Sequence, residues 1–229
     1  FAVVHAQGHV LGDVNHGNLL VGPDGTVMLI DCDSFQIGTG AHVFTCDVGV
    51  PLFSAPEIHG RALRGLLRTA NHDRFGLAVL LFHLLYMGRH PFAGRFSGQG
   101  DMPIEKAVAE YRFAYGPDRG ANNMERPPGT IALETMGTTI SDLFVRAFER
   151  SGSNGGRPDA EAWIDALEKL ESILCVCSTA NWHHYPGELH DCPWCAIEGQ
   201  TGIRLFGQRI IIDSRTGGID LATLWRAIT

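Results

Sequence analysis

The hydrophobic positions of the chain follow a helical period over most of its middle and later parts. Residues 78–86 are apolar on every side, which predicts a buried helix at residues 73–87. Apolar side chains recur every three or four positions in residues 139–150 and 160–172, so two amphipathic helices should pack around it. A fourth helix is expected at residues 104–115. The pattern therefore predicts a mainly α-helical lobe.

Near the N-terminus the hydrophobic pattern is that of strands. The apolar runs at residues 19–21 and 27–30 are separated by Gly-Pro-Asp-Gly, whose residue types favour a tight turn. We therefore expect a short β-hairpin, which makes the fold α+β overall. The hairpin would place Asn18 and Asp31 at the same end, with Asp13 on the preceding loop. Oxygen ligands that converge in this way could hold Mg²⁺ on a polyphosphate and orient an attacking hydroxyl.

An aspartate and an asparagine spaced in this way are commonly no more than a solvated turn, so the interpretation needs further support. Four further landmarks provide it. The landmarks are Ala55-Pro56-Glu57, Asp73 near the start of the buried helix, the turn Gly88-Arg89-His90-Pro91-Phe92, and Arg157-Pro158. Together with the hairpin they resemble the C-terminal lobe of the protein kinases, over residues 1 to about 172. We therefore expect a kinase-like C-terminal lobe at residues 1–173.

The resemblance to kinases implies catalytic roles for the polar residues around the hairpin. Asp13 would orient the hydroxyl of the acceptor. Asn18 and Asp31 would bind ATP through Mg²⁺. Asp33 would add a second carboxylate beside the metal. These roles predict phosphoryl transfer from ATP to Ser or Thr of a protein substrate.

Three other residues would have architectural roles in a kinase-like lobe. Asp73 would cap the buried helix and accept backbone N–H bonds from the loop that carries Asp13. Glu57 would form a buried, bidentate ion pair with Arg157. None of the three is expected to touch a substrate.

The chain departs from the usual kinase sequence in ways that bear on mechanism. Gly12 stands where most kinases have an arginine that binds a phosphorylated activation loop, so activation by loop phosphorylation is disfavoured. Asn15 replaces a lysine that steadies the transferring phosphate. Nothing matches the N-terminal lobe, so we expect a fragment of a longer protein, inactive by itself. Residues 220–229 predict the start of one more amphipathic helix.

Composition narrows the possible functions. The 229 residues, of which 45% are hydrophobic, suffice for one sizeable core and a small appendage. A net charge of −7 without basic runs argues against nucleic acid as a partner. The apolar run at residues 78–86 is shorter than the roughly 18 residues that a membrane span needs. No secretory signal is visible, so we expect a cytoplasmic location, where the six cysteines would not form disulfides.

Cysteine, histidine and tryptophan become dense after residue 174. Cys192 and Cys195 have the two-residue spacing of a zinc knuckle, and Cys177 with a nearby histidine could complete a Cys₃His site. Such a zinc would be structural, since four protein ligands leave no open position. The alternative is a redox pair, although no thioredoxin-like βαβ pattern surrounds it. We expect a zinc-knuckle segment and a C-terminal tail at residues 174–229.

The combination of a kinase-like lobe with this segment resembles a bacterial group of Hanks-type Ser/Thr kinases. The resemblance favours His183 as the histidine ligand, because those kinases place a histidine two residues before a tyrosine. His184 is the second choice, and His190 lies too close to the knuckle. The group also implies a PP2C phosphatase and a von Willebrand A-type protein as partners.

Two other functions remain open. A pseudokinase or signalling scaffold would keep the fold without transferring phosphate, but Asp13, Asn18 and Asp31 are all intact. A small-molecule phosphotransferase of the aminoglycoside or choline kinase type would share these three residues. Against it stands the complete segment from Asp31 to Glu57, which in kinases forms a platform for a peptide.

Overall fold

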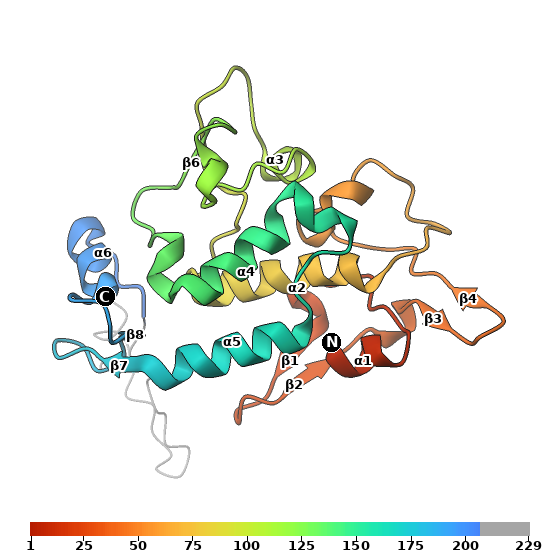
Figure 1. Cartoon of the computed structure of the whole chain (residues 1–229), viewed down its shortest axis with the longest axis horizontal. Coiled ribbons are helices and arrows are strands. Elements are labelled where there is room, and N and C mark those ends of the chain that lie inside the picture. The colour runs from red at the N-terminus through yellow and green to blue at the C-terminus, as the bar shows by residue number, and fades with distance from the viewer. Residues whose placement is uncertain (207–229) are drawn as a thin grey trace, which may run out of the picture. The chain divides into compact units, whose positions relative to one another are not determined.

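The computed structural model describes residues 1–206, and the helix expected at residues 220–229 lies outside that range. The chain divides into two compact units, Phe1–Ile173 and Leu174–Thr229. In the described residues, both units combine helices with antiparallel sheets of two strands each, so the fold is of mixed type (Figure 1). No helix in this part of the chain is long and apolar enough to cross a membrane.

Three long helices form the centre of the first unit. α2 (Ala70–Leu85) packs against α4 (Thr138–Phe148), and α4 packs against α5 (Ala160–Ile173) (Figure 1). Their positions confirm three of the helices predicted from the hydrophobic pattern. A short helix, α1 (Ala2–Ala6), comes before them in the chain.

The start of α2 corrects one prediction. Thr69, not Asp73, is the N-cap, and its backbone N–H donates to Nδ1 of His72 at 2.9 Å. The sequence pointed to Asp73 because aspartate is a good N-cap, but Asp73 lies inside the first turn and its carboxylate is used elsewhere. It is buried, with 2% of its surface exposed.

Phe82 of α2 lies at the centre of an aromatic core. Its ring stacks on that of Tyr86 with centroids 4.1 Å apart, and it meets Tyr115 and Phe144 edge-on. Further buried rings extend the cluster: Phe75, Phe92, Phe113, Phe148 and Trp163. Since these rings come from α2, α4, α5 and two loops, the cluster fixes the helices against one another.

The helix predicted at residues 104–115 is shorter than expected, because α3 (Ile104–Ala109) ends early. Tyr111 adopts the left-handed conformation with φ at 59°, and Arg112 N donates to Ala107 O at 2.8 Å. This is a Schellman closure, which usually has glycine in the place of Tyr111. The apolar residues beyond it made the segment look helical, but they reach the aromatic core from a loop.

The predicted hairpin is present. β1 (Leu19–Val21) pairs with β2 (Val27–Leu29), with Leu19 opposite Leu29. Ile30 N donates to Asn18 O at 3.0 Å, which brings the residues flanking the strands together. Four apolar side chains of the hairpin are exposed: Leu20, Val21, Val27 and Met28.

Two smaller antiparallel sheets of two strands complete the first unit. β3 (Ile37–Gly38) pairs with β4 (Val43–Phe44), and β5 (Arg95–Phe96) pairs with β6 (Met124–Glu125). The sheet of β3 and β4 lies between Asp31 and Glu57, in the segment that resembles a kinase activation segment in sequence.

The second unit begins with a hairpin and continues into a helix. β7 (Leu174–Val176) pairs with β8 (His184–Pro186), and α6 (Pro193–Thr201) follows. Pro193 occupies the first turn of α6, and Gly202 closes the helix in the left-handed conformation with φ at 68°. In the described part of the unit, few side chains are buried: Cys177, Ala180, His183, Pro186, Trp194 and Ile197.

Candidate functional site

The carboxylate of Asp13 is held by two asparagines. Nδ2 of Asn15 donates to Asp13 Oδ1 at 3.1 Å, and Nδ2 of Asn18 donates to Asp13 Oδ2 at 3.2 Å. The same two amides donate to the backbone carbonyl of Asp13, at 3.2 and 3.0 Å. Each carboxylate oxygen keeps further lone pairs, so Asp13 can act as an oriented acceptor for an additional hydroxyl.

Asn15 is nearly buried and is part of the loop architecture. Its Oδ1 accepts a hydrogen bond from Gly17 N at 2.8 Å, which caps the single 3₁₀ turn leading to Asn18. Both ends of its side chain are therefore occupied. Asn15, which was compared with the usual kinase lysine, therefore holds Asp13 in position in this chain.

Asp31 lies directly beyond β2 and has a left-handed backbone, with φ at 59°. Its carbonyl accepts hydrogen bonds from the backbone N (3.2 Å) and the hydroxyl (2.9 Å) of Ser34. A hydrogen bond with Asp33, the negative charge of Asp33 and, more weakly, that of Asp13 raise the pKa of Asp31. A bound cation would relieve this repulsion.

These carboxylates do not form a closed metal cage. Within residues 1–206, the only group of three or more His, Cys, Asp or Glu side chains whose ligand atoms lie within 4.8 Å of one another is in the second unit. An open arrangement suits Mg²⁺, which is usually bound by one or two carboxylates together with phosphate oxygens of a substrate. Asn18 and Asp31 could hold Mg²⁺ in this way, with Asp33 nearby.

Asp73 ties the loop before Asp13 to α2. Its Oδ2 accepts a hydrogen bond from Leu11 N at 2.7 Å, and its Oδ1 accepts one from Gly12 N at 2.9 Å. Nε2 of His5 lies 2.9 Å from the same Oδ2. The structure thus places Asp73 as an organiser of this loop and adds His5, which no sequence motif singled out.

Glu57 and Arg157 form a two-pronged ion pair. Nη1 and Nη2 of Arg157 donate to Oε1 and Oε2 of Glu57 at 2.6 and 2.8 Å. Burial acts to raise the pKa of Glu57, but the hydrogen bonds and charge of Arg157 outweigh burial and hold that pKa below its ordinary value. The pair joins the end of the segment that starts at Asp31 to the turn before α5.

Two polar residues, Gln36 and Arg68, are buried and bonded to each other, which the sequence analysis did not predict. Gln36 Oε1 accepts from Arg68 N and Gln36 Nε2 donates to Arg68 O, both at 2.8 Å. Neither residue belongs to a motif, and nothing in the local hydrophobic pattern marks either as buried. Their pairing depends on tertiary structure, so the sequence carries no signal for it.

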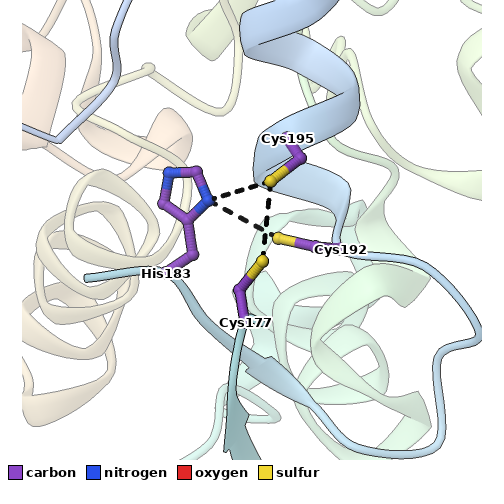
Figure 2. Close-up of side chains that lie close together, drawn as sticks. All are labelled: Cys177, His183, Cys192 and Cys195. Carbon is purple, nitrogen blue, oxygen red and sulfur yellow. Dashed lines mark hydrogen bonds between the residues drawn. The ribbon is translucent and has the colours of Figure 1, made fainter. Parts of the chain in front are cut away.

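The second unit brings the four predicted metal ligands together (Figure 2). Nδ1 of His183 lies 3.6 Å from Cys192 Sγ and 3.4 Å from Cys195 Sγ, and the sulfurs of Cys177 and Cys195 are 3.6 Å apart. Zn–S bonds of about 2.3 Å in a tetrahedron place neighbouring ligand atoms about 3.8 Å apart, and slightly less where one is nitrogen. The group therefore has the size and donor set of a tetrahedral Cys₃His site.

Surrounding groups orient the ligands of this cluster. Glu198 Oε1 lies 3.3 Å from Nε2 of His183, on the side of the ring away from the sulfurs. A carboxylate in that position favours the tautomer whose Nδ1 is free to bind a metal. Thr179 N donates to Cys177 Sγ at 3.4 Å, and backbone N–H groups lower the pKa of the Cys177 thiol to about 6. Glu198 thus favours the tautomer of His183 that can bind a metal, and the backbone N–H groups favour the thiolate of Cys177.

The neighbouring candidates stay outside the cluster. His184 is exposed on β8, and only its backbone carbonyl is engaged, by Trp194 Nε1 at 2.7 Å. His190 is exposed beside Asp191. All six cysteines are free, and Cys177 and Cys195 are farther apart than bonded sulfurs. The cluster could therefore bind a metal such as zinc through His183 and three cysteines.

Comparison with known proteins indicates the class of protein to which the chain is similar. The chain is similar along its whole length to bacterial proteins named as protein kinases. They are protein kinase YegI of Escherichia coli O157:H7, 42% identical, and protein kinase YegI of E. coli strain K12, 41% identical, each over an alignment of 234 residues. The alignments cover 100% of this chain and 36% of each relative, so the chain spans about a third of their length. No family model matches the chain.

Proposed function

We propose that the chain supplies the catalytic loop, the metal-binding aspartate and the activation segment of a Ser/Thr protein kinase. The observation that carries the proposal is the oriented carboxylate of Asp13, held by Asn15 and Asn18 beside Asp31. Similarity to relatives named as protein kinases supports phosphoryl transfer as the reaction type. The segment from Asp31 to Glu57, anchored by Arg157, supports a protein as the acceptor.

In the proposed reaction each residue has one task. Asp13 accepts a hydrogen bond from the acceptor hydroxyl and directs its oxygen toward the phosphate. The amide oxygen of Asn18 and the carboxylate of Asp31 hold Mg²⁺, and Asp33 adds negative charge beside them. Mg²⁺ bound with ATP supplies positive charge that stabilises the phosphate oxygens during transfer. The loop is held in place by Asp73.

The Cys₃His cluster is proposed to bind one structural Zn²⁺. The small number of buried side chains in the described part of the second unit supports this role, because such a core needs a further constraint. The proposed cellular location of the protein is the bacterial cytoplasm. The proposed partners are a protein substrate, a PP2C phosphatase and a von Willebrand A-type protein.

Substitution of Asp13 and Asp31 in a protein of the relatives' full length tests the function. Asp13→Asn and Asp31→Asn should each lower phosphate transfer from ATP to protein by about 10² or more, because positioning and charge provide most of the catalysis. Asp101→Asn is the matched control, since Asp101 is exposed. Thermal unfolding should be the same in all four proteins.

The same assay separates the alternatives. Transfer that survives both substitutions would show that these residues are not catalytic. Nucleotide binding without transfer in the wild type would identify a pseudokinase. Phosphorylation of a small alcohol but of no protein would identify a small-molecule phosphotransferase.

A further inference from the structure

Arg68 is buried beside the loop of Asp13, with 3% of its surface exposed. Nη1 of its guanidinium donates to the carbonyl of Gly12, the residue before Asp13, and Nη2 donates to Val48 O at 2.5 Å. One side chain thus bridges the catalytic loop and the segment between Asp31 and Glu57.

The backbone of Arg68 is fixed as firmly as its side chain. Gln36 binds its N–H and its carbonyl, and the backbone of Gln36 pairs with that of Val10 through two hydrogen bonds of 2.8 and 3.1 Å. Arg68 therefore projects from an anchored position, two residues before α2 begins. The side chain of Arg68 is therefore not a flexible surface side chain, and its contacts are fixed by the tertiary structure.

Two glycines permit the close packing around Arg68 and its neighbour Cys46. A Cβ on Gly12 would lie 2.6 Å from Cys46 Sγ and 3.4 Å from Nη1 of Arg68. A Cβ on Gly49 would lie 3.2 Å from Nη2 of Arg68. Gly12 also has φ at +77°, which side chains other than glycine rarely adopt. Gly12 therefore leaves room for Cys46, and Gly49 leaves room for the guanidinium of Arg68.

A buried guanidinium is costly unless its donors are satisfied. Among residues 1–206, no carboxylate forms a salt bridge with Arg68, and its guanidinium donates to the backbone carbonyls of Gly12 and Val48. Nε of Arg68 is buried without a hydrogen-bond partner among residues 1–206. The bridge between the two carbonyls is nevertheless complete without a phosphate group, because both terminal nitrogens donate within the chain.

We propose that Arg68 is a positioning residue that holds the loop of Asp13 against residues 46–49 without phosphorylation. The catalytic consequence rests on the proposed kinase function: Asp13 is kept in its oriented state constitutively. The structural part does not depend on that function and can be tested by itself.

Hydrogen exchange in the full-length protein tests the structural part. Arg68→Gln removes the guanidinium, and it should raise amide exchange in residues 9–13 by about tenfold or more, since the loop loses an interaction with a buried charged donor. Arg68→Lys keeps the charge but cannot donate from two fixed nitrogens, so it should fall between wild type and Arg68→Gln. Arg61→Gln, on an exposed residue nearby, should exchange like wild type.

Phosphatase treatment of the wild type is the second arm. Exchange in residues 9–13 should stay unchanged after all phosphate is removed. The proposal is overturned if treatment loosens the wild type to the level of Arg68→Gln. It is also overturned if Arg68→Lys, or Arg68→Gln in folded form, exchanges like wild type.

Phosphate transfer by the same variants tests the catalytic part. Arg68→Gln should lower kcat while the KM for ATP stays within about twofold, because Arg68 acts on Asp13 and not on nucleotide binding. Faster exchange together with unchanged kcat would overturn the catalytic part alone. No transfer even in the wild type would instead count against the proposed function and leave the exchange result standing.

Discussion

Arg157 and Glu57, 100 residues apart in sequence, meet through two hydrogen bonds of 2.6 and 2.8 Å. The arginine side chain is fully buried, whereas the glutamate is 23% exposed. The pair therefore closes a long loop from inside the protein, and its partners cannot turn to water without local unfolding.

Arg157→Leu should lower the free energy of unfolding by roughly 3 kcal/mol. It leaves the partly buried Glu57 with only the long contacts to the Tyr111 hydroxyl at 3.4 Å and to His72 at 3.8 Å. Arg95→Leu is the control. Arg95 faces Glu125 at 3.8 Å with 79% and 62% of the side chains exposed, and its loss should cost under about 0.5 kcal/mol. Urea unfolding measures both values. Equal effects of the two substitutions would contradict the role given to the buried pair.

The contribution of Glu57 should depend on pH in a definite direction. The folded protein holds the pKa of Glu57 below its ordinary value of 4.5. The ion pair therefore stabilises the fold at pH above that value, and the stabilisation is lost as pH falls toward the lowered pKa. The difference in unfolding free energy between wild type and Arg157→Leu should shrink below pH 4.5.

The aromatic core gives a second test of stability. Phe82→Ala should cost about 3–5 kcal/mol, because it opens a cavity where several rings meet. Leu84 lies on the same helix with 76% of its surface exposed, so Leu84→Ala should change stability by less than about 0.5 kcal/mol. Chemical denaturation of the two variants gives the comparison. A small effect at Phe82 would mean that the core is not organised around its ring.

Adjacent histidines allow a sharp test of the metal centre. His183→Ala should lower the zinc content well below one per chain, whereas His184→Ala should leave it near one, because only His183 faces the sulfurs. Elemental analysis of purified protein measures the content. Cobalt substitution adds a spectroscopic check, since thiolate ligands give intense charge-transfer bands. Loss of metal in His184→Ala but not in His183→Ala would reverse the assignment.

Asp31 should titrate at a higher pH than an ordinary aspartate, whose pKa is 3.8, because Asp33 stabilises its protonated form. A raised pKa in the folded state means that this group favours folding at low pH and that the benefit disappears as pH rises through the raised value. Asp33→Asn should bring the pKa of Asp31 down toward its ordinary value. NMR titration of the Asp31 carboxyl carbon measures the shift, with Asp142→Asn on exposed α4 surface as the control. No change in Asp33→Asn would disprove the coupling.

Local patterns were enough to predict several parts of the structure. The unbroken apolar run located α2, the apolar period located α4 and α5, and the Gly-Pro-Asp-Gly turn located the first hairpin. The spacing of Cys192 and Cys195 pointed to the cluster that the structure assembles. Each of these signals lies within a short stretch of sequence, where periodicity or spacing dictates the geometry.

Other parts depend on contacts between distant segments. The left-handed conformation of Tyr111, which ends α3, is not typical of tyrosine, so the residue type does not mark this helix end. The capping of α2 by Thr69 depends on His72, a residue outside the usual capping pattern. The guanidinium of Arg68 packs closely against Gly49, 19 residues away, where a Cβ would lie 3.2 Å from Nη2. No single stretch of sequence contains these relationships.

The first hairpin has a practical consequence for handling the protein. Its exposed faces carry Leu20, Val21, Val27 and Met28, and among residues 1–206 each of its two strands has an edge without a neighbouring strand. A narrow ribbon with apolar side chains and free backbone groups is a template for joining to another chain. Samples of this chain should therefore become oligomeric as they are concentrated, and charged substitutions on the ribbon should keep them monomeric.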